Sequence, residues 1–203
     1  MGAAAGMGKR KVGFVGVGLM LAPLLLAATG CGYIESRKQS IAEGSNQRGL
    51  EWAQTGEYDK AIWEFGEALK IRPDFADAFN NRGSVLLTQG EADKALWNFD
   101  QAIKAKPDYA EALNNRGMAL AGKGEADSAL WNFDQAVKAK PEYPEAFYNR
   151  GRLHLARGEP DKALWNFDQA LKSRPDFVAA EQASEEARTL KAGVTAPAEV
   201  MPR

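Results

Sequence analysis

The chain has 203 residues, of which 45% are hydrophobic, and its 26 basic and 27 acidic residues give a formal net charge of −1. The length suits one or two domains, and the hydrophobic fraction is ordinary for a folded protein. Because the charge is balanced, no basic surface points to DNA or RNA, and we expect no nucleic acid among the partners.

Residues 1–30 have the composition of a signal peptide for export. Three basic residues, Lys9, Arg10 and Lys11, precede an apolar and uncharged stretch at 12–28. Its 17 residues fall short of the roughly 20 that cross a membrane as a helix. The basic start and the small-residue exit are typical of a secretory signal. A retained membrane anchor is the alternative interpretation.

The only cysteine, Cys31, follows Ala28-Thr29-Gly30. This sequence resembles the bacterial lipoprotein box, in which a cysteine after small residues is lipidated and becomes the new N-terminus. The resemblance implies fatty acyl (palmitate) chains on Cys31 and a lipid-anchored protein facing the periplasm. Since Gly32 rather than Asp follows the cysteine, it also implies the outer membrane. The alternative is an incidental free thiol. Residues 31–41 form either a tether or the first turns of the first repeat helix.

A 34-residue period organises the rest of the chain. Similar sequence recurs around four prolines that follow one another at this spacing: Pro73, Pro107, Pro141 and Pro175. A fixed period between about 20 and 50 residues is typical of stacked repeat arrays. If the proline is position 32 of a unit, the four units are 42–75, 76–109, 110–143 and 144–177.

Several further positions hold the same residue in every unit. Glycine stands at positions 8 and 15, alanine at 20 and 27, and phenylalanine at 24. Together with Pro at 32, this pattern resembles the tetratricopeptide repeat (TPR). The resemblance implies an all-α, right-handed α-solenoid of four TPR helix-turn-helix units, which serves as a scaffold for protein partners. Glycine at 15 supplies the positive φ that ends the first helix of a unit, and proline at 32 cannot continue the second.

These signals place the repeat helices near 44–55, 58–71, 76–88, 92–105, 110–122, 126–139, 145–156 and 160–173. Residues 178–191 read as one more helix with a dense charged face, as expected of a cap on an open stack. The tail 192–203 contains two prolines and no periodicity, so we expect it to be disordered.

The sequence offers no catalytic or metal-binding set. His154 is the only histidine, and neither a Ser/His/Asp set nor a Cys/His cluster nor a phosphate-binding loop occurs. His154 stands at position 11, where the other units have Trp52, Leu86 and Leu120, so we interpret it as a structural residue. We therefore expect no enzyme activity, no metal and no cofactor.

Polar residues at positions 2, 5, 6 and 9 of the first helix predict a partner-binding groove. Asparagine offers both a donor and an acceptor, which suits an extended peptide backbone. The alternative is that these asparagines are only solvated or cap helices. The expected groove residues are Asp77, Asn80, Asn81, Ser84, Glu111, Asn114, Asn115, Met118, Glu145, Tyr148, Asn149 and Arg152. The lysines with which TPR proteins clamp a terminal carboxylate are missing at positions 2 and 5.

Two positions depart from the family pattern. Position 7 holds Arg48, Arg82, Arg116 and Arg150, which we interpret as a structural ladder to Asn or Glu at position 23 or to acids of a neighbouring unit. A binding patch is the alternative. Position 22 holds Trp63, Trp97, Trp131 and Trp165. Helical geometry directs position 22 away from the core face, which predicts a convex aromatic row. The row is either a binding strip or a set of rings that lie flat on their own helix or under a neighbouring unit.

The sequence thus predicts a lipid-anchored scaffold that binds other envelope proteins or peptide segments. By resemblance, such lipoproteins act as adaptors for peptidoglycan enzymes or as assembly factors for secretin and pilus machines. The alternative is a peptidoglycan- or carbohydrate-binding module that uses the tryptophan row.

Overall fold

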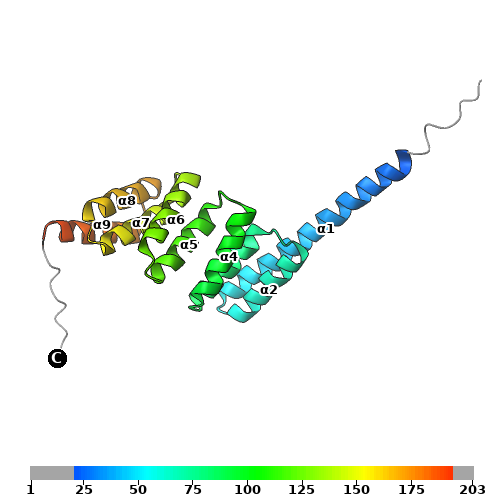
Figure 1. Ribbon diagram of the computed structural model, residues 1–203, viewed down its shortest axis with the longest axis horizontal. Helices are drawn as coiled ribbons and strands as arrows, with labels where there is room; N and C mark the ends of the chain where they lie inside the picture. Colours follow the sequence, from blue (N-terminus) through cyan, green and yellow to red (C-terminus); the bar gives the residue numbers. More distant parts are fainter. Residues whose placement is uncertain (1–20, 194–203) are drawn as a thin grey trace, which may run out of the picture.

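The computed structural model describes residues 21–193, with side chains from residue 32 onward. Within this range the chain forms nine α-helices and no strand, which follow one another in an elongated stack (Figure 1). The helices are α1 (Leu21–Gln54), α2 (Tyr58–Ile71), α3 (Ala76–Thr88), α4 (Ala92–Ala105), α5 (Ala110–Gly122), α6 (Ala126–Ala139), α7 (Pro144–Ala156), α8 (Pro160–Ser173) and α9 (Val178–Lys191). The predicted all-α solenoid is confirmed.

Neighbouring helices pair into units. We call α1, α3, α5 and α7 the A helices and α2, α4, α6 and α8 the B helices. Each A helix packs against the B helix that follows it, and each B helix packs against the next A helix. Successive A helices also touch one another, from α1 through α7 to α9. Every unit therefore meets only its neighbours, as expected of a repeat stack.

Glycine at position 15 forms the turn inside each unit. The backbone φ of Gly56, Gly90, Gly124 and Gly158 lies between 70° and 80°. Among the described residues no amino acid other than glycine has a positive φ. These glycines adopt the left-handed conformation that a β-carbon disfavours, and the A helix ends there.

Glycine at position 8 and phenylalanine at position 24 form the closest contact of each unit. The rings of Phe65, Phe99, Phe133 and Phe167 are buried almost completely. A β-carbon on the facing glycine would lie between 2.5 and 2.7 Å from the nearest ring carbon. The absence of a side chain at position 8 therefore lets the two helices of a unit approach around the ring.

Helix α1 is longer than the other helices and projects from the stack (Figure 1). Residues 32–41 are helical and exposed, and burial begins at Ala42. Of the two expectations for 31–41, the helix continuous with the first repeat helix is the one observed. Residues 1–20 of the expected signal peptide lie outside the described residues, as does the side chain of Cys31. Among the described helices, none is both long and apolar enough to span a membrane.

Helix α9 closes the far end of the stack. Ala180, Ala183 and Ala187 are buried against the last unit, while charged residues such as Glu185 and Lys191 are exposed. The helix occupies the place of a further A helix and touches both α8 and α7. A polar outer face on the last helix keeps the apolar interior of the stack away from water. Residues 194–203 of the tail expected to be disordered lie outside the described residues.

Candidate functional site

The asparagines of the A helices bond to one another between units. Each position-6 amide donates to the side-chain oxygen of the position-5 asparagine one unit earlier: Asn81 to Asn46 at 3.1 Å, Asn115 to Asn80 at 3.0 Å and Asn149 to Asn114 at 2.9 Å. Asn80 and Asn114 are only 7% and 3% exposed. These bonds join the A helices to one another and use part of the hydrogen-bonding capacity of the amides.

Several other residues of the expected groove also contact neighbouring side chains. Ser84 accepts a bond from Asn115 at 3.2 Å. Arg152 pairs with Glu186 of α9 at 2.6 Å. The ring of Tyr148 packs against Phe167 and Phe177. Of the expected set, Met118 remains exposed and apolar.

Two of the three acidic groove residues at position 2, Glu111 and Glu145, pair with basic side chains. Lys140 Nζ lies 3.0 Å from Glu111, and Arg174 Nη1 lies 2.7 Å from Glu145. Burial is the largest single influence on Glu111 and would raise its pKa. The hydrogen bond from Lys140, a backbone hydrogen bond and the charges of Lys140 and Lys106 together outweigh burial, so the pKa is lowered. Asp77 stands beside Tyr109, whose pKa is raised first by burial and then by its bond with this carboxylate.

The arginines at position 7 form the ladder that the sequence predicts. Arg82 and Arg150 each donate from Nε to the amide oxygen of the asparagine at position 23, Asn98 and Asn166, at 2.7 Å. Arg116 donates to Asn132 at 3.3 Å, and Arg48 binds Glu64 through Nε and Nη2, each at 2.8 Å. The expected acceptors at position 23 are confirmed.

The arginine at position 7 and the tryptophan at position 22, which both depart from the family pattern, lie close together in two of the units. The guanidinium carbon of Arg82 lies 6.0 Å from the ring centre of Trp97, and that of Arg150 lies 5.6 Å from Trp165. Each arginine also covers the phenylalanine at position 4, Phe79 or Phe147. Those phenylalanines meet the tryptophans edge to face, with ring centres 5.9 and 6.0 Å apart. The tryptophan is thus held by the A helix of its own unit.

The aromatic row is nevertheless open to solvent. Trp63 is 61% exposed, and Trp97, Trp131 and Trp165 are between 53% and 55% exposed. Large aromatic rings are usually buried, so a row of four half-exposed tryptophans is an apolar surface of the kind that marks contact sites.

Grooves accompany this row. One of about 590 Å³ lies between α2, α3 and α4 and is lined by Ile62, Arg82, Leu86 and Trp97 among others. A groove of about 330 Å³ includes Trp131, one of about 420 Å³ includes Trp165, and another of about 420 Å³ includes Trp63. Every tryptophan at position 22 therefore stands at a groove. The sequence period predicted that the tryptophan ring points away from the core, but it did not predict the groove beside the ring.

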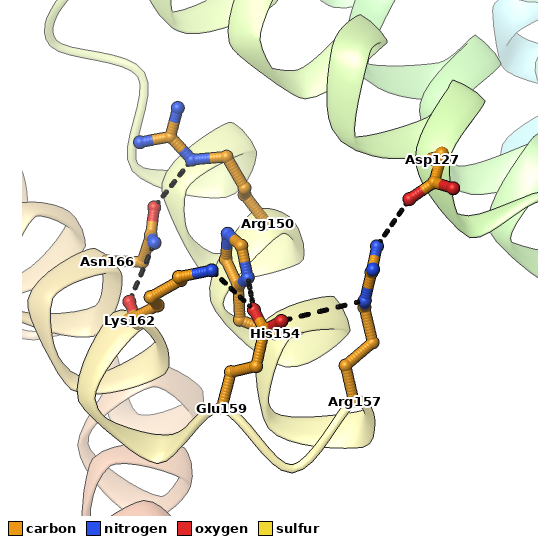
Figure 2. A network of polar contacts seen from close by, with 7 residues as sticks. All are labelled: Asp127, Arg150, His154, Arg157, Glu159, Lys162 and Asn166. Atoms are coloured by element: carbon orange, nitrogen blue, oxygen red, sulfur yellow. Dashed lines mark hydrogen bonds and ion pairs between the residues drawn. The ribbon is translucent and has the colours of Figure 1, made fainter.

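His154 belongs to a network of polar contacts at the turn of the fourth unit (Figure 2). Its Nδ1 lies 2.7 Å from Glu159, which also accepts a bond from Lys162 at 3.1 Å. Arg157 beside it reaches back to Asp127 of the preceding unit at 2.6 Å. Among the described residues no cluster of His, Cys, Asp or Glu is suited to hold a metal ion.

Residues 49–90 and 83–124 match a family described as TPR repeat, and residues 124–176 match a family described as Tetratricopeptide repeat. The chain belongs to the tetratricopeptide repeat family. TPR proteins are generally non-catalytic scaffolds, and this membership supports a role in protein–protein interaction. A search among curated proteins gives no match.

Solved TPR structures are similar over most of the chain. YrrB, described as "a TPR protein with an unusual peptide-binding site", is 26% identical with a TM-score of 0.60, over 81% of this chain and 88% of YrrB. A thermophilic TPR protein of Thermus thermophilus is 26% identical with a TM-score of 0.65, over 75% and 84% of the two chains. PilF of Pseudomonas aeruginosa is 22% identical with a TM-score of 0.67, over 79% of each chain.

Proposed function

We propose that this TPR protein is a lipid-anchored scaffold of the bacterial cell envelope, with its repeat stack in the periplasm. The lipoprotein-box sequence before Cys31 supports the anchor. Helix α1 begins on the N-terminal side of Cys31 and runs without interruption into the first unit. A lipid on Cys31 would hold the stack at a distance from the bilayer, because the exposed helical turns of 32–41 lie between them. Gly32, which follows the cysteine in the lipoprotein-box sequence, favours the outer membrane.

The observation that carries the scaffold role is the row of four half-exposed tryptophans, each at a groove. Many polar side chains of the A helices bond to one another or to basic residues, whereas the tryptophan row offers apolar area and hydrogen-bonding groups together. Such surfaces are typical of protein interfaces, where tryptophan and arginine are enriched. We call the surface formed by the four tryptophans at position 22 and the arginines beside them the B-helix face. We therefore assign partner binding to this face, with envelope proteins or their peptide segments as partners. The peptide-binding site named for YrrB supports a peptide ligand.

Two experiments test this proposal. Cys31→Ser prevents acylation, so the variant is expected in the soluble fraction of broken cells while the parent stays with the membranes. Retention of the variant on membranes would contradict the lipid anchor. Chemical cross-linking of intact cells is expected to join the parent to a protein of defined mass. Trp97→Ala with Trp131→Ala is expected to abolish that adduct, and an undiminished adduct would contradict the proposed face.

A second candidate is binding of peptidoglycan or another carbohydrate by the same row. The half-exposed tryptophans at groove mouths favour it, because aromatic rings with one apolar face free can cover a sugar ring. Sedimentation with purified peptidoglycan separates the two candidates. Co-sedimentation that disappears in the Trp97→Ala, Trp131→Ala variant supports the carbohydrate, and no co-sedimentation rejects it.

A further inference from the structure

Three of the four arginines at position 7 have a carboxylate partner. Arg48 pairs with Glu64 at 2.8 Å, Arg116 with Asp100 at 2.8 Å and Arg150 with Asp134 at 2.6 Å. Arg82 differs: among residues 32–193, no Asp or Glu oxygen lies within 4.0 Å of its guanidinium. The side-chain acceptor that it does have is the neutral amide oxygen of Asn98, at 2.7 Å.

The sequence explains the exception. Asp100 and Asp134 stand at position 25 of the unit before their arginine, and the equivalent residue before Arg82 is Gly66. A β-carbon on Gly66 would lie 4.0 Å from Arg82 Nη1 and would meet no other atom within that distance. The place that a carboxylate fills beside the other two arginines is therefore free beside Arg82.

Arg82, which borders this free place, also lines the groove of about 590 Å³ between α2, α3 and α4. Arg82 lines it together with the apolar Ile62, Leu86 and Trp97. The groove also contains Asp59 and Glu91, which are bonded to Gln89 and to Lys94 respectively. Burial lowers the pKa of Arg82, although an arginine remains charged at any physiological pH. A partly desolvated guanidinium without a carboxylate gains strongly from an anion that binds it through two parallel hydrogen bonds.

We propose that this groove binds an Asp or Glu side chain of a partner polypeptide. The carboxylate sits on the Arg82 guanidinium, where Gly66 leaves room, and a neighbouring apolar side chain of the partner packs on Trp97 and Ile62. We choose a side chain rather than a chain end, because Asp side chains fill the equivalent place beside Arg116 and Arg150, namely Asp100 and Asp134. The proposal deepens the scaffold function and rests on it for the identity of the ligand as a polypeptide.

The test uses the full-length chain in mild detergent, labelled with 5-fluorotryptophan, so that ¹⁹F NMR resolves the ring of Trp97. Trp97→Phe assigns its resonance. The probes are a blocked hexapeptide with one glutamate after a leucine, its glutamine counterpart, and the glutamine peptide with a free C-terminal carboxylate. The glutamate peptide is expected to shift the Trp97 resonance saturably, with a dissociation constant about fivefold or more below that of the blocked glutamine peptide.

Two reciprocal variants sharpen the test. Gly66→Asp supplies the carboxylate internally, as units two and three already do, and is expected to weaken glutamate binding about fivefold or more. Asp100→Gly removes the partner of Arg116 and is expected to create a response at Trp131. Equal affinity for glutamate and blocked glutamine peptides, no binding of either, or an unaffected Gly66→Asp variant would overturn the proposal. Binding of the free-carboxylate peptide as tight as that of the glutamate peptide would overturn the choice of a side chain. Because synthetic peptides are used, these outcomes are independent of whether a cellular partner is found by cross-linking.

Discussion

A β-carbon built on Gly83 would lie 2.7 Å from Cε1 of Phe99, whose ring is fully buried. Real carbon atoms do not approach so closely, and the ring has no free space into which to move. The relationship recurs in all four units, which makes it the contact that sets the spacing of the A and B helices. It is the packing on which the positions of Arg82 and Trp97 depend.

Gly83→Ala is accordingly expected to lower the free energy of unfolding by about 1–3 kcal/mol, because an added methyl overpacks the core. Urea unfolding followed by circular dichroism measures the effect. The matched control is Gly122→Ala, where a β-carbon meets nothing within 4 Å and alanine is the better helix former. An alanine at 83 that is as well tolerated as one at 122 would contradict this account of the core.

Arg150 and Arg152 stand two residues apart on α7 and provide a second comparison. Arg150 is 12% exposed and binds both Asn166 and Asp134, whereas Arg152 is 47% exposed and pairs only with Glu186 on the surface. Arg150→Ala is expected to cost about 1.5–3 kcal/mol, as for a charged hydrogen-bonded group. Arg152→Ala is expected to cost at most about 1 kcal/mol. Thermal unfolding of the two variants tests the difference, and equal losses would count against a structural ladder at position 7.

The asparagine ladder is best tested by a double-mutant cycle. Asn149 donates to the buried Asn114 at 2.9 Å across the boundary between units three and four. The changes Asn114→Ala and Asn149→Ala, singly and together, are expected to give a coupling energy of about 0.5–1.5 kcal/mol in unfolding. Additive losses would show that the two amides do not stabilise each other, and would leave them available to a ligand.

The His154–Glu159 contact predicts a pH dependence. The hydrogen bond with His154, followed by that with Lys162, lowers the pKa of Glu159 below its ordinary value. A group whose pKa is lowered by folding stabilises the protein above its unfolded pKa and loses this contribution as the pH falls through the folded value. The parent should therefore exceed Glu159→Gln in Tm at neutral pH, and the gap should shrink below about pH 4.3, the ordinary pKa of glutamate. A gap that stays constant with pH would contradict the contact.

The 34-residue period was enough to predict the repeat helices apart from the early start of α1, because glycine at 15 and proline at 32 mark the helix ends in every unit. It also predicted the Arg82–Asn98 bond, because positions 7 and 23 face each other within one unit. It did not predict that Asn80 and Asn114 would be bonded across units, since a contact such as that of Asn115 with Asn80 depends on how tightly successive A helices stack. The sequence also did not predict that Gly66 leaves Arg82 without a carboxylate, because the residue at position 25 contacts the arginine of the next unit and not of its own.

We expect partners to bind the B-helix face, built from the tryptophans and arginines, and not the A-helix groove. Site-specific photo-cross-linking in intact cells tests it most directly, with a benzophenone amino acid placed at Trp97 or Trp131 on one face and at Met118 or Arg152 on the other. We expect a protein adduct of the same mass from both B-helix positions and none from the A-helix positions. Adducts from Met118 and Arg152 alone would contradict the claim.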